Sequence, residues 1–197
     1  MSACGLMDRA LVFGTSCGGS IPPRRTHKMN TKPPIHNLVI CANVIVRMNG
    51  KYLFMKRSKN KIDAPGYIHP FGGKIDLNEN PYVGAVREVK EEVGIEIENL
   101  KLEAVVLEIQ PDKEKPENWL IFYFIADYKS GKMLATDEGE AVFLDKQEIL
   151  SSHLFPSLKK VIKDILNPND GTVFVTNKYT GFESGLQEIT KNICVTK

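Results

Sequence analysis

The chain has 197 residues, of which 42% are hydrophobic and 25% are charged, which is typical of one soluble globular domain with a sizeable core. Its 26 basic and 24 acidic side chains nearly cancel, which argues against a protein that binds nucleic acid or an anionic membrane through bulk charge. No apolar run approaches the roughly 18 residues of a membrane-spanning helix, so transmembrane helical proteins are excluded.

Residues 1–35 are predicted to be a disordered tail, and residues 36–197 a single folded domain. The tail contains a Gly-Gly pair and two Pro-Pro pairs and has no hydrophobic period. Translation that starts at Met29 would also account for it, and its basic, acid-poor composition is weakly similar to an organellar transit peptide. The four cysteines have no C-x-x-C spacing, which favours free thiols in a reducing compartment and a cytoplasmic location.

The first predicted element of the domain is a strand over residues 38–46. These residues are nearly all apolar and many are β-branched, as in a strand buried on both faces of a sheet. Asn49 and Gly50 favour a type I′ turn, after which the apolar residues 52–55 would return as the second arm of a β-hairpin. A loop rich in lysine is then expected over residues 56–67.

The clearest helix pattern covers residues 80–93. Asn80 can cap the first turn, Pro81 suits the first helical position, and Gly94 is expected to end the helix. Apolar side chains recur every three or four residues, which predicts one stripe that a sheet covers. The members of this predicted stripe are Tyr82, Val86, Val89 and Val93.

The rest of the chain alternates between predicted strands and one further helix. The predicted strands cover residues 102–109, 120–127, 141–144 and 172–176. Apolar residues at helical spacing between Leu158 and Ile165 predict an amphipathic helix that starts after Pro156. No internal repeat is present, so a repeat architecture is not expected.

Three glutamates are expected on the face of the first helix that the apolar stripe leaves free. Glu88, Glu91 and Glu92 are spaced i, i+3 and i+4, which places their carboxylates in one patch. Like charges at this spacing destabilise a helix, whereas a bound divalent cation reverses the effect, and hard oxygen ligands suit Mg²⁺ or Mn²⁺. A solvated acidic face, relieved by the neighbouring Arg87 and Lys90, is the alternative interpretation.

The residues around this helix match a longer motif. Gly73, Glu79 and residues 87–95 fit the pattern G-x5-E-x7-R-E-U-x-E-E-x-G-U, in which U is an apolar residue. This pattern is the Nudix box, and the chain resembles the Nudix hydrolase family over roughly residues 34–166. The resemblance implies an α/β fold of the mixed α+β kind, in which a mixed β-sheet is sandwiched between α-helices. It also implies hydrolysis of a nucleoside diphosphate that is linked to another moiety.

The resemblance also implies roles for individual residues. Glu88, Glu91 and Glu92 are the expected metal ligands, with the carbonyl group of Gly72 beside them. Arg87 would orient the glutamates through ion pairs. The implied cofactor is Mg²⁺, with Mn²⁺ as a second possibility, because a divalent ion can activate water and neutralise charge on phosphoryl oxygens.

Two further acids are expected to assist this chemistry. Glu79 resembles a supporting acid at the junction of loop and helix, from which it could reach the metal through water. Further along the chain, Glu138 is favoured over Glu140 as one more metal ligand or as the general base. An ordinary polar turn explains either of these two residues equally well.

The segment around the glycine pair favours one branch of the family. Residues 69–74, His-Pro-Phe-Gly-Gly-Lys, resemble the branch that hydrolyses oxidised purine nucleoside triphosphates such as 8-oxo-dGTP. The implied reaction converts a (d)NTP or oxidised (d)NTP to the monophosphate and pyrophosphate. Lys56, His69 and Phe71 are the expected substrate contacts, and Trp119 could stack on the base or serve only in packing. The acidic pair and tryptophan with which relatives read oxidised guanine are missing from the corresponding region.

Two alternatives stay open at this point. An ADP-ribose or nucleotide-sugar pyrophosphatase is suggested by Pro111, sixteen residues after Ile95, although a proline that bounds a hairpin loop is the simpler explanation. A non-catalytic, nucleotide-sensing regulator is the other, but such proteins usually lose catalytic glutamates that this chain keeps. The expected partner is a small-molecule nucleotide, with no nucleic acid or membrane partner, and the chain is expected to be a monomer or homodimer.

Overall fold

The computed structural model describes residues 37–60, 64–109, 117–134, 139–167, 171–179 and 186–195. The strands are β1 (Leu38–Met48), β2 (Lys51–Arg57), β3 (Ile68–His69), β4 (Phe71–Lys74), β5 (Ile95–Ile109), β6 (Asn118–Gly131), β7 (Gly139–Leu144), β8 (Gly171–Tyr179) and β9 (Leu186–Val195). The helices are α1 (Pro81–Val93), α2 (Lys146–Ser151) and α3 (Pro156–Leu166). The tail expected over residues 1–35 lies outside the described residues and stays a prediction.

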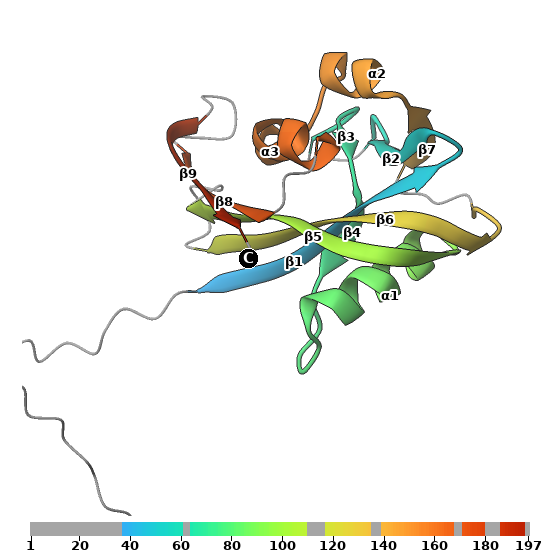
Figure 1. Cartoon of the computed structure of the whole chain (residues 1–197), viewed down its shortest axis with the longest axis horizontal. Coiled ribbons are helices and arrows are strands. Elements are labelled where there is room, and N and C mark those ends of the chain that lie inside the picture. The colour runs from blue at the N-terminus through green and yellow to red at the C-terminus, as the bar shows by residue number, and fades with distance from the viewer. Residues whose placement is uncertain are drawn as a thin grey trace, which may run out of the picture. The chain divides into compact units, whose positions relative to one another are not determined.

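The described strands form one mixed sheet. Its main path runs β3-β2-β1-β6-β5-β8-β9, while β4 pairs with β1 and β7 pairs with β2. The β1–β6 and β5–β8 pairs are parallel, and the remaining pairs are antiparallel. Helix α1 covers one face of the sheet and helices α2 and α3 lie over the other (Figure 1). The predicted architecture, a mixed sheet between helices, is therefore confirmed.

Strand β1 contributes to a hydrophobic core on each face of the sheet. Cys41, a free and buried thiol, and Ile45 belong to the core on the α3 side, whereas Val44 belongs to the core on the α1 side. This alternation follows from the two-residue period of a strand. The prediction of a strand buried on both faces is wrong at its beginning, because Leu38 and Ile40 are 36% and 39% exposed.

The predicted β-hairpin is confirmed. Strands β1 and β2 pair antiparallel, with Val46 opposite Leu53. The connecting residues Asn49 and Gly50 have φ angles of 52° and 76°, the left-handed values that a type I′ turn needs. Strand β2 continues to Arg57, so the first residues of the predicted lysine-rich loop belong to a strand instead.

Strand β4 contains the glycine pair, Gly72 and Gly73. Gly72 and Gly73 pair with Asn43 and Ala42 of β1. Gly72 has a φ of 137°, and a Cβ atom there would lie 2.0 Å from the carbonyl oxygen of Ala42. Only glycine permits this backbone conformation and this close approach of β4 to β1. The glycine at position 72 is therefore required for the pairing of the two strands.

Helix α1 begins and ends as predicted. The side chain of Asn80 accepts hydrogen bonds from the backbone N–H groups of Tyr82 and Val83, each at 3.0 Å. Gly94 ends the helix with a φ of 78°, and its N–H donates to the carbonyl group of Lys90. The capping residues therefore fix both ends of the segment that carries the glutamates.

The buried stripe of α1 differs from the predicted one. Val89 and Val93 are buried as expected, but Tyr82 and Val86 are 54% and 38% exposed. Ala85, four residues before Val89, is fully buried and takes the place of the larger residues. The helix therefore turns its smallest side chains toward the sheet, which lets the two backbones come close.

The remaining predicted elements are present. The four strands predicted after the first helix lie within β5, β6, β7 and β8, and the second predicted helix is α3. The α3 residues Leu158, Val161, Ile162 and Ile165 are at most 1% exposed and pack on the sheet. Helix α2 and strands β3 and β9 were not predicted. Among the helices described here, none is both long and apolar enough to cross a membrane.

Candidate active site

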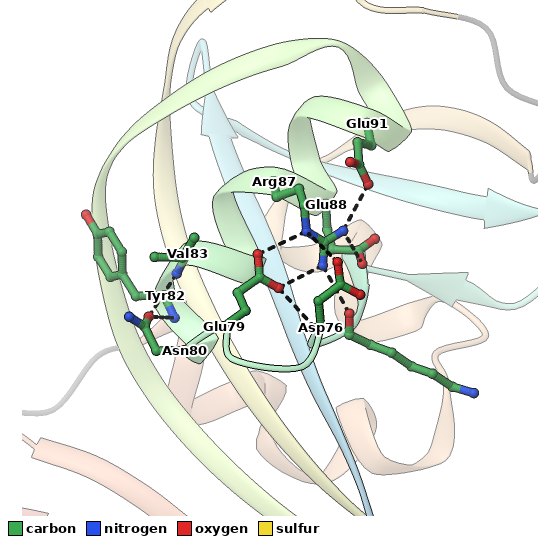
Figure 2. A network of polar contacts seen from close by, with 9 residues as sticks. Asp76, Glu79, Asn80, Tyr82, Val83, Arg87, Glu88 and Glu91 are labelled. Atoms are coloured by element: carbon green, nitrogen blue, oxygen red, sulfur yellow. Dashed lines mark hydrogen bonds and ion pairs between the residues drawn. The ribbon is translucent and has the colours of Figure 1, made fainter.

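A network of ion pairs centred on Arg87 connects α1 to the segment that precedes it (Figure 2). The Nη1 atom of Arg87 donates to Glu88 Oε1 and to Glu91 Oε2, both at 2.9 Å. Its Nε and Nη2 atoms donate to the two oxygens of Glu79 at 3.0 and 2.9 Å. Nη2 also donates to the carbonyl oxygen of Lys74, at 3.2 Å. One guanidinium group thus positions three carboxylates and the end of β4.

Glu79 is the bidentate partner of Arg87. Its side chain is only 10% exposed, and it also accepts a hydrogen bond from the backbone N–H of Asp76 at 3.1 Å. The hydrogen bonds from Arg87 hold the pKa of Glu79 below its usual range. A Cβ atom on Gly84 would lie 2.9 Å from Glu79 Oε2, so this glycine of α1 leaves the space that Glu79 occupies. Glu79 therefore acts as an ionised anchor at the junction of loop and helix.

Glu88 and Glu91 share Arg87 but differ in their surroundings. The Glu88 side chain is 15% exposed, and its partial burial raises the pKa of the carboxyl group. A Cβ atom on Gly73 would lie 2.7 Å from Glu88 Oε2, which means that the carboxylate rests directly against β4. The Glu91 side chain is 61% exposed. The helix thus offers one inner and one outer carboxylate.

Glu92 connects α1 to β4 directly. Its Oε2 atom accepts a hydrogen bond of 2.8 Å from the backbone N–H of Gly72. The structure therefore brings the glycine pair and all three glutamates of the helix together, as their spacing predicted. The alternative of a purely solvated acidic face does not describe Glu88, which is mostly buried.

The chemistry of this cluster fits a hard divalent cation. Carboxylate oxygens and the nearby Gly72 carbonyl are the type of ligand that Mg²⁺ and Mn²⁺ prefer. The absent side chain at Gly73 keeps β4 within reach of the Glu88 carboxylate. Within the described ranges, no three acidic, histidine or cysteine side chains are already arranged to hold a metal ion. Because Arg87 engages Glu88 and Glu91, metal binding would replace some of these ion pairs.

Lys56 and His69 lie on the neighbouring strands β2 and β3. Lys56 is exposed and pairs in register with Ile68, and the half-buried His69 ring packs edge-on at 5.5 Å from Phe155. The backbone N–H of Ile68 donates to the carbonyl group of His153 at 2.8 Å. Strands β2 and β3, which carry Lys56 and His69, and the segment at His153 are thus neighbours, while contact of Lys56 and His69 with a substrate stays a prediction.

Phe71 and Trp119 lie on opposite faces of the sheet. Phe71 is 1% exposed and packs in the core on the α1 side, so its side chain offers no surface to a ligand. We therefore correct its expected role from substrate contact to packing. Trp119 is half-buried at the border of the core on the α3 side, and the Nζ atom of Lys74 lies 5.9 Å from the centroid of its ring system. The stacking role of Trp119 on a base stays a prediction.

Glu138 and Glu140 are the two candidates for the additional metal ligand or general base, and the structure describes only the second of them. Glu138 lies outside the described residues, so its role as a metal ligand or general base stays a prediction. Glu140 is exposed on β7, where it pairs in register with Lys56 of β2. The position of Glu140 is that of an ordinary surface residue on a strand.

The buried polar residues on the α3 side of the sheet that the sequence analysis missed include Glu108 and Asn177. Glu108 of β5 is 3% exposed and Asn177 of β8 is fully buried. Each follows a buried valine by two residues, Val106 and Val175 respectively, and so projects from the same face as that valine. Both positions are ones at which the alternation of a strand predicts an apolar residue facing the core. A polar residue at such a position is the sequence signal that could have identified them.

Comparison with known proteins agrees with this fold and site. A family model described as NUDIX domain matches residues 37–165, which is more than half of the chain. The chain therefore belongs to the Nudix family. Its class is a hydrolase that acts on pyrophosphate bonds, and the family implies a small-molecule nucleotide substrate.

Two relatives agree with the family assignment, over alignments of different length. The chain is similar to a MutT-like protein of Streptomyces ambofaciens, with 40% identity over 68 residues, 34% of this chain. That match covers only 40% of the length of the Streptomyces protein. The chain is also similar to the uncharacterized Nudix hydrolase YvcI of Bacillus subtilis, with 26% identity over 140 residues, 70% of this chain and 85% of that protein.

Two solved structures show the likeness in three dimensions. The crystal structure of a MutT protein from Bacillus halodurans superposes with a TM-score of 0.67 and 25% identity, covering 78% of this chain and 97% of that one. The MutT Nudix hydrolase from Burkholderia pseudomallei has a TM-score of 0.56 and 24% identity, covering 65% of this chain and 98% of that one. The second likeness concerns the fold alone.

Proposed function

We propose that this chain is a metal-dependent pyrophosphohydrolase that cleaves a (d)NTP, or an oxidised (d)NTP, to the (d)NMP and pyrophosphate. The observation that carries the proposal is the cluster in which Arg87 and the glycine pair of β4 hold three glutamates of α1 together. The similarity to MutT proteins supports a nucleoside triphosphate as substrate. The activity would be located in the cytoplasm, where free thiols are stable.

The proposed cofactor is Mg²⁺, with Mn²⁺ as a possible substitute. When bound, the ion supplies charge neutralisation on phosphoryl oxygens and a more acidic water. Glu88, Glu91 and Glu92 would hold it, together with the carbonyl group of Gly72. The mostly buried Glu88 fixes the inner side of the site, and the exposed Glu91 faces the side from which substrate and water arrive.

The other charged groups of the cluster would position these ligands. The Nη1 atom of Arg87 donates to both Glu88 and Glu91 and would thereby fix the separation of the two carboxylates. Glu79 holds the guanidinium plane through two hydrogen bonds and thereby prevents Arg87 from turning toward solvent. Glu138 is proposed as an additional ligand or as the base that accepts a proton from the attacking water.

The proposed substrate contacts lie on three strands of the sheet, β2, β3 and β6. Lys56 and His69 would approach the base or sugar from β2 and β3, and Trp119 would contact the base from β6. Their grouping with the His153 segment at one part of the sheet supports the first two. The partial exposure of Trp119 supports the third, since part of its side chain is open to solvent.

A substrate panel tests this proposal. Purified full-length protein with Mg²⁺ is incubated separately with normal and oxidised (d)NTPs, with ADP-ribose and with a nucleotide sugar, and the products are quantified. We expect pyrophosphate and the monophosphate from a nucleoside triphosphate. AMP release from ADP-ribose, without turnover of triphosphates, would instead identify an ADP-ribose or nucleotide-sugar pyrophosphatase. Nucleotide binding without any hydrolysis would instead identify a sensor and contradict the proposal.

A further inference from the structure

Asp76 brings one more carboxylate to the Arg87 cluster (Figure 2). Its Oδ2 atom lies 3.8 Å from the Nε atom of Arg87, which makes an ion pair but is too long for a hydrogen bond. Among the described residues, Arg87 is the only cation that pairs with this carboxylate, and the Asp76 side chain is 75% exposed. The Asp76 carboxylate is therefore next to the guanidinium group and has room to change its contact with it.

The backbone of Asp76 is fixed although its side chain is exposed. Its N–H donates to Glu79 Oε2, and its carbonyl oxygen accepts from the N–H of Glu79, both at 3.1 Å. Asn78 between them has a φ of 70°, a left-handed conformation that asparagine tolerates in turns. This turn ties Asp76 to the residue that binds Arg87 through two oxygens, so the Asp76 carboxylate is kept beside the guanidinium group.

Every N–H group of the Arg87 side chain already has an acceptor. Nε and Nη2 donate to the two oxygens of Glu79, and Nη2 also donates to a backbone carbonyl group of β4. The two N–H groups of Nη1 donate to Glu88 and to Glu91. In this arrangement no N–H group is left for Asp76, which agrees with its longer distance.

Glu88 and Glu91 are also proposed metal ligands, so the contacts of Arg87 depend on whether these carboxylates hold an ion. If their oxygens turn to a cation, the N–H groups of Nη1 lose their acceptors. The guanidinium group and the cation would also repel each other as like charges. Glu79 would then be the remaining carboxylate that accepts from Arg87, and a second one nearby would offset both effects. Asp76 is the carboxylate in that place.

We propose that Asp76 is a positioning residue for the metal site, which pairs with Arg87 when Glu88 and Glu91 hold the divalent ion. It thereby keeps the guanidinium group anchored on the loop side of the cluster. This inference rests on the proposed function, because it takes these two glutamates as ligands of the ion. Asp76 acts through Arg87 and does not itself touch the ion or the substrate. Without an ion its contribution is small, since Arg87 then has all its other partners.

Binding of Mn²⁺ alone to the full-length protein tests this proposal without turnover. Free Mn²⁺ is measured by electron paramagnetic resonance during a titration that contains no nucleotide. We expect Asp76→Asn to raise the Kd for Mn²⁺ at least ~3-fold, within the range for one exposed ion pair. Asp76→Glu, which keeps the charge, should bind Mn²⁺ like the parent protein.

The metal-free protein supplies the comparison for a purely structural effect. In EDTA, Asp76→Asn should have the same Tm as the parent protein, because the hydrogen bonds of Arg87 are complete without Asp76. A Kd for Mn²⁺ equal to that of the parent protein overturns the proposal. A lower Tm in EDTA together with an unchanged Kd would show that Asp76 only stabilises the loop, and it overturns the proposal as well.

A double-mutant cycle separates an effect through Arg87 from a direct effect on the ion. If Asp76 acts through Arg87, Asp76→Asn should leave the Kd for Mn²⁺ unchanged in the Arg87→Met background. The same rise in Kd in both backgrounds would mean that the Asp76 charge attracts the ion directly, and the positioning role would be wrong.

Glu79→Gln gives a second background in case Arg87→Met does not fold or does not bind Mn²⁺. Loss of the Glu79 charge makes Arg87 depend more on Asp76, so Asp76→Asn should raise the Kd by a larger factor there than in the parent protein. An equal factor in the two backgrounds contradicts an action through Arg87. The matched control is Glu98→Gln, which removes an exposed carboxylate of β5 outside the cluster and should bind Mn²⁺ like the parent protein.

Activity measurements separate this inference from the proposed function. Asp76→Asn should need more Mg²⁺ for half-maximal activity and keep the parent kcat when Mg²⁺ is saturating. Mn²⁺ binding that depends on Asp76 through Arg87, without hydrolysis of any nucleotide, would retain the positioning role and reject the hydrolase. Hydrolysis of triphosphates by the parent protein, with the same Mn²⁺ affinity in Asp76→Asn, would retain the hydrolase and reject the positioning role.

Discussion

Glu91 is the most exposed of the three helix glutamates, and its contact with Arg87 is made through a single oxygen. Replacing it with glutamine keeps the shape of the side chain but removes its charge. We predict that Glu91→Gln lowers kcat by at least ~10²-fold, the usual effect of removing one preorganised charge-stabilising group. Pyrophosphate release at matched Mg²⁺ concentration measures this, and an unchanged Tm shows that the fold is intact.

A matched control for Glu91→Gln is Glu98→Gln, which removes one exposed carboxylate from β5. This control should retain the kcat of the parent protein, since Glu98 lies on a strand outside the Arg87 cluster. Turnover by Glu91→Gln that equals the control would remove Glu91 from the active site.

Arg87 positions its partners through the planar geometry of its guanidinium group as well as through charge. Lysine keeps the charge but cannot bind both oxygens of Glu79 while also contacting Glu88 and Glu91. We predict that Arg87→Lys lowers kcat about 10-fold or more and raises the Mg²⁺ concentration needed for half-maximal activity. Arg47→Lys, which changes a surface ion pair with Asp127, is the control. Identical Mg²⁺ dependence in both variants would contradict the positioning role.

Strand β4 depends on glycine more strictly than the turns do. Alanine at Gly72 would combine a φ of 137° with a Cβ atom 2.0 Å from a backbone oxygen. We predict that Gly72→Ala lowers the free energy of unfolding by about 3 kcal/mol or more, because the new Cβ atom would clash with backbone atoms of β1, which cannot move aside as a flexible side chain could. Gly50→Ala, at a φ of 76° with nothing within 4 Å of the Cβ position, should cost only about 1 kcal/mol. Equal midpoints in urea denaturation would disprove the close approach of β4 to β1.

Elements with a local pattern could be predicted from the sequence, and elements defined by distant partners could not. The hairpin at Asn49 and Gly50 and the caps of α1 depend on neighbouring residues, which is why both were predicted. Strands β3 and β4 contain only two and four residues, and they exist because β1 and β2 pair with them. Strand β9 likewise depends on its pairing with β8.

The candidate site shows the same division. The spacing of Glu88, Glu91 and Glu92 predicted their common patch, because helix geometry alone decides it. The burial of Phe71 in the α1-side core could not be predicted, since it depends on the pairing of the short strand β4 with β1. The polar pair Glu108 and Asn177 comes together only through the parallel pairing of β5 with β8, which no local pattern encodes.

The stability of the whole domain should depend on pH through Asp127, which links three strands. Hydrogen bonds from Asn99 of β5 and Arg47 of β1 lower the pKa of this carboxyl group in the folded state. The unfolded value is about 3.9, so the stabilisation is fully present above that pH and is lost as the pH falls through the lower folded value. We predict that Asp127→Asn is less stable than the parent protein near neutral pH.

The size of this pH effect is limited by the partial exposure of the pair. The side chains of Arg47 and Asp127 are 43% and 34% exposed, so the difference at neutral pH should be at most about 1 kcal/mol. Urea denaturation of both proteins between neutral pH and pH 3 measures it. The difference should shrink below about pH 4; a difference that grows on acidification would contradict the assignment.

The most direct measurement for the enzyme as a whole is ³¹P NMR of a nucleoside triphosphate incubated with the full-length protein. With Mg²⁺, the spectrum should show the monophosphate and pyrophosphate forming together, EDTA should stop the reaction, and added Mg²⁺ should restart it. Resonances of the intact triphosphate that persist with Mg²⁺ present, or a cleavage rate that EDTA leaves unchanged, would contradict a metal-dependent pyrophosphohydrolase built on the Arg87 cluster.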